Sequence, residues 1–146
     1  MTPGASGGGY SGTPLPRKLG ITADARLALL GAPDGFEAVL GELPPGVVVR
    51  RRLRGSCDVI VAFCPRRSTL ERRLGGWRSS LDEAGGLWVA WPKRSSGVAT
   101  DLTESIVREL GLAAGLVDNK VCAIDATWSG LRFVYRLADR ASSGRA

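Results

Sequence analysis

The stretch KVCAIDATWSGLRFVYRL, residues 120–137, decides the fold. Its apolar start, KVCAID (120–125), predicts a buried strand. The end, LRFVYRL (131–137), alternates apolar and polar side chains, which indicates a half-exposed strand. The segment between them, ATWSG (126–130), has five residues. A parallel crossover needs about a dozen residues or more, so the two strands are predicted to form an antiparallel hairpin.

Four more strands are predicted upstream, and helices alternate with them. The strands are the apolar runs at residues 25–30, 47–51, 57–64 and 86–91. Strand–helix alternation favours a parallel sheet that is covered on both faces. We therefore predict an α/β three-layer sandwich whose six-stranded, mostly parallel sheet ends in an antiparallel hairpin.

The predicted helices follow from caps and apolar spacing. A short helix is expected at residues 13–20, with Thr13 as its cap, and another at 36–43, before two prolines. Leu70, Leu74, Trp77 and Leu81 share one helix face, although Gly75 and Gly76 weaken that helix. A fourth helix is expected to start at Thr100 or Asp101, with Asp101 and Glu104 as a capping box, and to end at Gly111 and Gly115.

Composition excludes several classes of protein. The chain has 146 residues and a net charge of +6, which suggests one domain and allows an anionic partner. It contains no histidine, which removes Ser-His-Asp catalysis and histidine-bound metals. The three cysteines form no Cys-x-x-Cys pair, so neither a zinc site nor a disulfide framework is predicted. With no signal peptide and no apolar run of membrane-spanning length, we expect a cytoplasmic protein with no membrane partner.

A parallel sheet that ends in a strand hairpin resembles the Rossmann-like fold of methyltransferases, here in a reduced form. That fold implies a glycine-rich first turn and a carboxylate at the end of the second strand. The first turn here, GAPDG (31–35), lacks a Gly-x-Gly, and Pro33 removes a backbone donor. The second strand ends in RRRLR (50–54), so cations replace the acid. We predict no cofactor, while a degenerate or active S-adenosylmethionine-dependent enzyme stays an alternative.

Ligands of open parallel sheets bind beyond the carboxyl ends of the strands. The loops expected at this rim are residues 31–35, 64–68, 91–100 and 125–130. They collect cations, small hydroxyl side chains and two tryptophans that could hold an anion or a ring. The candidate residues are Arg66, Arg67, Trp91, Lys93, Arg94, Ser95, Ser96, Thr100 and Trp128. The competing interpretation stays open, because Asp101 would repel an anion and tryptophans at strand ends commonly pack in the core.

The arginine runs at residues 50–55 and 66–73 raise the alternative of a nucleic-acid binder. No recognition motif accompanies them and no aromatic residue is interleaved with the arginines. A solvated surface is therefore the favoured interpretation, and nucleic acid is not the expected partner.

Four segments closely resemble a bacterial family of small uncharacterised proteins, domain of unknown function 3052. They are GYSGTPLPRKLGI (9–21), LLGAPDGFEAVLGELPPGV (29–47), LWVAWPKRSSGVATDLTE (87–104) and GLVDNKVCAIDATWSGLRFVYRL (115–137). The resemblance implies no activity and no catalytic residue. It does place Tyr10 within the domain, so we expect a disordered tail at residues 1–9, one domain at 10–138 and a loose tail at 139–146.

From these observations we expect a non-catalytic or regulatory domain. It would bind an anionic small molecule or a protein partner at the carboxyl rim of its sheet. Whether the chain catalyses a reaction stays open at the level of sequence.

Overall fold

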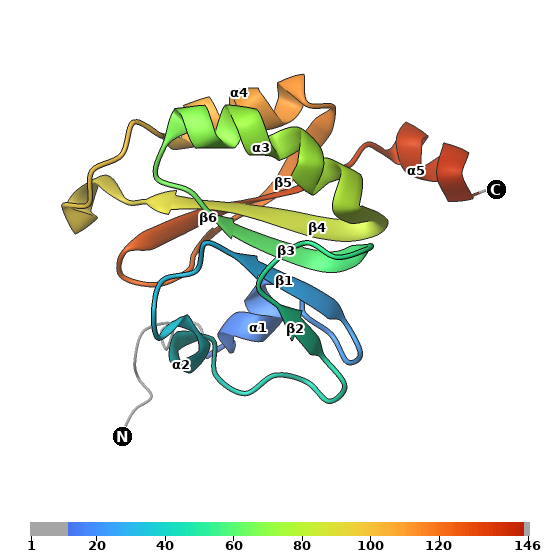
Figure 1. The fold of residues 1–146 in the computed structure, drawn as a ribbon, viewed down its shortest axis with the longest axis horizontal. Coiled ribbons are helices and arrows are strands. Elements are labelled where there is room, and N and C mark those ends of the chain that lie inside the picture. The colour runs from blue at the N-terminus through green and yellow to red at the C-terminus, as the bar shows by residue number, and fades with distance from the viewer. Residues whose placement is uncertain (1–11, 145–146) are drawn as a thin grey trace.

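A six-stranded sheet runs through the middle of the computed structural model, which describes residues 12–144 (Figure 1). The strands are β1 (Arg26–Leu30), β2 (Val48–Arg50), β3 (Cys57–Phe63), β4 (Leu81–Pro92), β5 (Leu116–Ala123) and β6 (Trp128–Tyr135). Their order is β2-β1-β3-β4-β6-β5. β6 runs antiparallel to both β4 and β5, and the other neighbours are parallel. The predicted mostly parallel sheet with an antiparallel hairpin is confirmed.

Helices cover the two faces of the sheet unequally. The face we call the α3/α4 face carries α3 (Arg67–Ser80) and α4 (Glu104–Ala113) (Figure 1). The opposite α1/α2 face carries the shorter α1 (Leu15–Lys18) and α2 (Phe36–Leu40). Each face has its own apolar core cluster. The three predicted layers are therefore present, and the α1/α2 layer is the thinner one.

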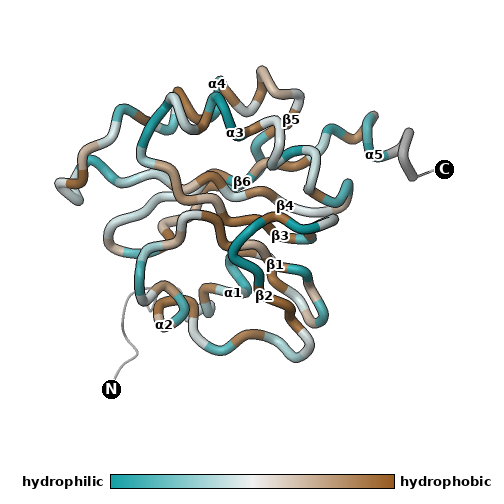
Figure 2. Tube along the Cα trace, viewed as in Figure 1, coloured by the Kyte–Doolittle hydropathy of each residue, from teal (hydrophilic) through white to brown (hydrophobic). Residues whose placement is uncertain are grey.

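The central strands are buried on both faces, which explains their continuous apolar sequence. β3 is buried at every position except Asp58, which is half-buried. In β4 the eight residues from Gly85 to Pro92 are all buried. Figure 2 shows the same pattern as apolar segments along these strands. Parallel strands covered on both sides have this character because neither face meets water.

Several element boundaries differ from the predicted ones. β4 begins at Leu81 and not near residue 86, because Leu81 leaves the helix and pairs with Cys57. β5 begins at Leu116, directly after Gly115, whose φ of 90° ends the preceding turn. α2 stops at Leu40, before the proline pair, because Gly41 takes a φ of 81°. Positive φ favours glycine, so Gly41 ends α2 early and Gly115 lets β5 start early, which periodicity alone does not indicate.

The caps and the C-terminal end also differ. Pro14, not Thr13, is the N-cap residue of α1. Residues 137–144, mostly predicted as a loose tail, form the helix α5 (Leu137–Gly144). The expectations for residues 1–9 and for Tyr10 lie outside the described residues. None of the helices in residues 12–144 has the length and apolar character needed to cross a membrane.

Candidate functional site

The carboxyl ends of β1, β2, β3, β4 and β5 meet at one edge of the sheet, the rim. Residues 31–35, 51–56, 64–66, 93–103 and 124–127 follow these ends. The segment 51–56 is missing from the four rim loops that the sequence indicated. Its position follows from the parallel pairing of β2 with β1. The sequence interpretation placed the loops after the other parallel strands at the rim, but it left out the loop after β2.

The two rim tryptophans do not face a common ligand. Trp91 lies opposite Ser129, and Trp128 lies opposite Pro92, in the β4–β6 ladder. Successive residues of a strand point to opposite faces, so the two rings are separated by the sheet. Trp91 is buried in the α3/α4 core, whereas Trp128 packs on the α1/α2 side. Both tryptophans therefore pack against the core, as the competing interpretation of the sequence held.

The loop after β4 uses its polar groups internally. The backbone N–H of Lys93 donates to the carbonyl of Thr127 over 2.7 Å, which ties the loop to the β5–β6 turn. Ser96 donates from its backbone and from its hydroxyl to the carbonyl of Lys93, at 3.0 and 2.6 Å. Arg94 and Ser95 are exposed on the resulting 3-10 turn, Arg94–Ser96. The loop is thus a closed turn and not an open cradle.

Thr100 and Asp101 connect this loop to the start of α3. The Thr100 hydroxyl donates to the carbonyl of Pro65 over 2.6 Å. The Asp101 carboxylate accepts the backbone N–H of Arg67 over 2.7 Å, at the first residue of α3. Arg66, the N-cap position of α3, has no capping side-chain hydrogen bond. Asp101 therefore supplies the cap of α3 from a distant part of the chain.

The helix that Asp101 was predicted to cap begins three residues later. Thr103 is the N-cap of α4, and its hydroxyl accepts the backbone N–H of Ile106 over 3.2 Å. The predicted capping box of Asp101 and Glu104 is wrong, because Asp101 is engaged at α3. The N-termini of α3 and α4 beside the rim are thus already capped by side chains of this chain.

The arginine runs are partly paired within the molecule. Arg50 donates to the carbonyl of Arg54 over 2.8 Å, and Arg51 forms an ion pair with Glu37. Arg67 pairs with Glu71 at 3.0 Å, one turn along α3. A shallow cavity of about 650 Å³ is lined by residues 50–54. The predicted preference for a solvated surface over a nucleic-acid site stays a prediction.

A second and larger cavity is a groove on the α1/α2 side of the sheet, with residues 123–126 at its rim end. It has a volume of about 1090 Å³ and lies between three segments, residues 12–22, 38–45 and 123–126. α1 and α2 lie beside each other under the sheet and form two of its walls (Figure 1). We call this cavity the α1/α2 groove. None of the nine candidate residues from the sequence lines it.

The walls of the groove combine apolar and charged side chains. Leu15, Ile21, Leu43 and Ile124 are among its apolar lining residues. Its lining also includes two cations and two acids: Arg17, Lys18, Glu42 and Asp125. The Asp125 carboxylate already accepts the backbone N–H groups of Thr127 and Trp128, each over 2.8 Å.

Three lysines gather where the groove meets β5. Burial raises the pKa of the Cys122 thiol, while the positive charges of Lys18, Lys120 and Lys93 act in the opposite direction. Lys120 also donates from Nζ to the carbonyl of Lys18 over 3.1 Å. Lys93 is thus near enough to Cys122 for its charge to act on that thiol. We call Lys18, Lys93 and Lys120 the lysine corner.

The crevice between β1 and β3 is the switch point of the sheet, where the strand order reverses. It is filled by aromatic rings: Phe63 lies 4.8 Å from Phe36 and 5.1 Å from Trp128, edge to face in both cases. The turn after β1 approaches so closely that a Cβ on Gly31 would lie 3.0 Å from the carbonyl oxygen of Phe63. This packing leaves the switch point closed by the chain's own side chains.

Comparison with solved structures identifies the fold. The chain resembles the fibrillarin pre-rRNA processing protein of Methanococcus jannaschii, with a TM-score of 0.58, 14% identity, and coverage of 84% of this chain and 69% of that one. It also resembles a SAM-dependent methyltransferase from Aquifex aeolicus, with a TM-score of 0.55, 12% identity, and coverage of 80% and 85%. The predicted methyltransferase-like fold is confirmed.

A third match, an O-methyltransferase family 2 protein from Planctomyces limnophilus in complex with apigenin, has a TM-score of 0.58 and 11% identity. The match covers 77% of this chain and 50% of that one. No family model matches the chain, and no curated protein matches its sequence. The resemblance to the family of unknown function therefore stays a prediction.

The fold family implies S-adenosylmethionine, and the residues at the switch point do not fit it. The three rings occupy the crevice, and Gly31 packs on the carbonyl of Phe63 where a ligand would need space. Arg50 and Arg51 stand at the end of β2, where a carboxylate would bind ribose. Within the described residues, no group of acidic or cysteine side chains is placed to hold a metal ion.

Proposed function

We propose that the protein binds an anionic small molecule with an apolar body in the α1/α2 groove, without catalysing a reaction on it. The observation that carries the proposal is a largely apolar groove whose wall includes Lys18, with Lys120 bonded to the carbonyl of Lys18 beside it. The proposal retains the anionic ligand and the rim location expected from the sequence, and moves the site from the loop after β4 to the α1/α2 side.

The size and lining of the groove support a small-molecule ligand. Pockets for such ligands commonly measure about 300–1,000 Å³ and combine apolar walls with a few polar groups that fix orientation. The groove, at about 1090 Å³, lies near the upper end of that range. Leu15, Ile21 and Leu43 would contact the apolar body, and burial of that surface would supply much of the affinity.

The charges near the groove support an anionic head group. Lys18 lies in the wall, and Lys93 and Lys120 act on the same buried thiol. Asp125 is an acid of the lining segment 123–126, and its carboxylate accepts two backbone N–H groups. A carboxylate or phosphate placed here would gain attraction that water screens only in part.

Isothermal titration with a matched pair of probes tests the proposal. 1-Naphthyl phosphate carries both an apolar ring and an anion, 1-naphthol carries the ring alone, and inorganic phosphate carries the anion alone. We expect naphthyl phosphate to bind at least about tenfold more tightly than either fragment, since each part adds roughly 1.4 kcal/mol or more. Lys18→Gln should weaken naphthyl phosphate several-fold, and Arg94→Gln, which removes an exposed cation outside the groove, should not.

A second variant separates the groove from a general charge effect. Leu43→Asp places a like charge in the apolar wall and should abolish binding of naphthyl phosphate. Equal affinity for naphthyl phosphate and inorganic phosphate, or unchanged binding in both Lys18→Gln and Leu43→Asp, would contradict the proposal.

A further inference from the structure

Arg132 lies on the α1/α2 face of the sheet without a charged partner. It stands opposite Trp88 in β4 and opposite Lys120 in β5. Its side chain is half-buried, and burial lowers the pKa of its guanidinium. Among the described residues, no hydrogen bond or ion pair joins Arg132 to another side chain or carbonyl. The partly buried Arg26 and Arg108, by contrast, are each held by carboxylates.

The sheet makes room for this guanidinium. A Cβ on Gly86 of β4 would overlap with the Nε, Cζ and Nη2 atoms of Arg132. The backbone of Gly86 is not in the left-handed region, so its conformation does not itself require glycine. On the other side, a Cβ on Gly20 would lie 4.0 Å from Nη2. Arg132 is therefore seated between β4 and the connection from α1 to β1.

A second arginine approaches the same place from α5. Burial is the main cause that lowers the pKa of Arg132, and the positive charge of Arg140 is the second cause. The Nε of Arg140 is itself buried, with no hydrogen-bond partner among the described residues. No carboxylate contributes to the pKa shift of Arg132. The two partly buried guanidinium groups thus lie near enough for their charges to repel each other, and a bound anion would relieve that repulsion.

We propose that Arg132 and Arg140 form a binding site for a phosphate-type oxyanion, either inorganic phosphate or the phosphoryl group of a small molecule. A guanidinium presents N–H groups in a planar fork that matches two oxygens of such an anion. The site borders the α1/α2 groove, because Gly20 lines the groove and Lys120 of the lysine corner stands opposite Arg132. Arg132 itself does not line the groove, so different variants test the two sites, Arg132→Gln for this one and Lys18→Gln for the groove.

Titration with inorganic phosphate, against chloride at equal ionic strength, tests this site. We expect phosphate to raise the Tm of the unmodified protein and to shift the Arg132 side-chain N–H resonance in an NMR spectrum. Arg132→Gln should weaken phosphate binding about tenfold to a hundredfold, as expected for the loss of charged hydrogen bonds. Arg140→Gln should weaken it in the same direction. Arg136→Gln, which removes an exposed arginine that follows β6, is the matched control and should keep the wild-type affinity.

Stability in chloride separates a ligand site from a structural role. Because Arg132 has no partner to lose, Arg132→Gln should be at least as stable as the unmodified protein when no phosphate is present. A large loss of Tm in chloride would show that Arg132 is structural and would overturn the proposal. So would a wild-type Tm that phosphate does not change, or a phosphate effect that persists in Arg132→Gln. Lys18→Gln, which tests the groove, should leave the phosphate effect intact.

Phenyl phosphate distinguishes the two sources of the anion. If the site takes a phosphoryl group on a larger molecule, phenyl phosphate should bind as tightly as inorganic phosphate or more tightly, and should lose affinity in Arg132→Gln. If the site takes the free ion, phenyl phosphate should bind more weakly. Failure of both anions to respond to Arg132→Gln would exclude the site.

Discussion

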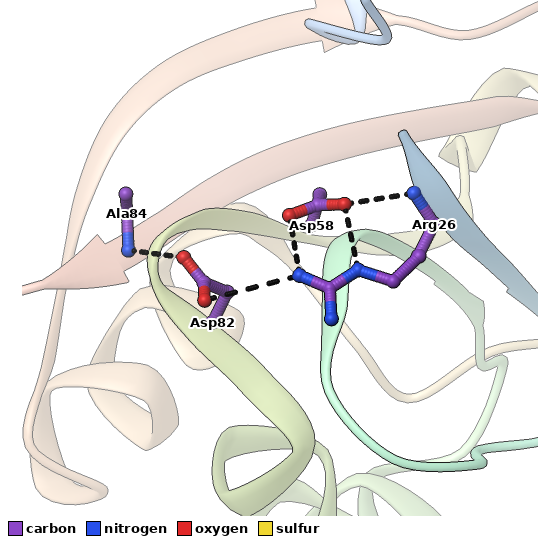
Figure 3. A network of polar contacts seen from close by, with 4 residues as sticks. All are labelled: Arg26, Asp58, Asp82 and Ala84. Atoms are coloured by element: carbon purple, nitrogen blue, oxygen red, sulfur yellow. Dashed lines mark hydrogen bonds and ion pairs between the residues drawn. The ribbon is translucent and has the colours of Figure 1, made fainter. Parts of the chain in front are cut away.

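Arg26 of β1 connects to two neighbouring strands through the carboxylates of Asp58 in β3 and Asp82 in β4, and Asp58 makes the closer contacts. The Oδ2 of Asp58 accepts the backbone N–H and the Nε–H of Arg26, at 2.8 and 3.0 Å, and its Oδ1 accepts Nη2–H at 2.9 Å (Figure 3). Asp82 of β4 lies 3.9 Å from the same Nη2 (Figure 3). Arg26 begins β1 and Asp58 lies in β3, so the contact fixes the amino-terminal ends of two neighbouring strands.

We predict that Asp58→Asn destabilises the protein and reduces its sensitivity to acid. The hydrogen bond from Arg26 lowers the pKa of Asp58 below its usual 3.8. A lowered folded-state pKa gives stability that is present above pH 3.8 and is lost as the pH falls through the folded value. Because the carboxylate is partly exposed, we expect a loss of about 1 kcal/mol in Asp58→Asn at neutral pH.

Urea unfolding at a series of pH values measures both effects. The difference in unfolding free energy between the unmodified protein and Asp58→Asn should shrink below pH 3.8. Asp82→Asn is the control, with a smaller effect, because its contact with Arg26 is longer. A constant difference between the unmodified protein and Asp58→Asn across this range would contradict the assignment.

Single residues of the candidate site were the hardest to predict from sequence. Asp101 is followed by a helix, and local spacing assigned it to that helix. In the structure it caps α3, which begins 34 positions earlier in the chain. Lys93 begins the same loop, but its charge acts on Cys122 of β5. Local patterns carry no information about such long-range partners. For the same reason they do not predict that Arg132 lacks a charged partner among the described residues.

Helices were predicted better than their ends. The apolar spacing of α3 and α4 located both helices, because a buried face imposes its period on the sequence. The positions of the glycines predicted the helix ends less well. Gly75 and Gly76 lie within α3 without breaking it, and Gly111 lies within α4, which it was predicted to end. A glycine in an apolar helical pattern therefore does not by itself predict that the helix ends there.

We predict opposite effects of alanine at Gly75 and at Gly111. A Cβ on Gly75 would meet nothing within 4 Å, so Gly75→Ala should raise the unfolding free energy by about 0.5–1 kcal/mol through helix propensity. A Cβ on Gly111 would overlap with the ring of Phe133. Gly111→Ala should therefore lower the unfolding free energy, since overpacking costs about 1–3 kcal/mol and exceeds the propensity gain.

Thermal and urea unfolding of the two variants provides the measurement. Combining Gly111→Ala with Phe133→Leu should cost less than the sum of the two single changes, because the shorter side chain leaves room for the added methyl group. Strict additivity, or stabilisation by Gly111→Ala alone, would show that α4 does not pack on Phe133 as described.

At the scale of the whole molecule, the layers were predictable and the cavities were not. Continuous apolar runs identified the buried strands, and the short segment 126–130 required the hairpin that closes the sheet. The α1/α2 groove has walls from three segments separated by up to about a hundred positions. Whether such segments leave a gap depends on side-chain packing, which a sequence pattern does not record. The filled switch point, with Phe36, Phe63 and Trp128, was hidden for the same reason.

The two layers that cover the sheet differ in thickness, which should make their local stabilities differ. α3 and α4 have 14 and 10 residues, while α1 and α2 have four and five. Short helices gain little stability from their own hydrogen bonds and depend on packing. Cys57 and Cys64 lie in the core under α3 and α4, and Cys122 lies in the core of the thinner layer.

We therefore predict that Cys122 reacts with iodoacetamide before Cys57 and Cys64 do. Burial raises the pKa of all three thiols, so each needs an opening of the structure before it forms a reactive thiolate. Local opening of the thinner layer should expose Cys122 at a lower free energy than global unfolding. Mass spectrometry of the labelled chain at increasing urea concentrations resolves the order. Simultaneous labelling of all three cysteines would mean that both layers open in one cooperative step.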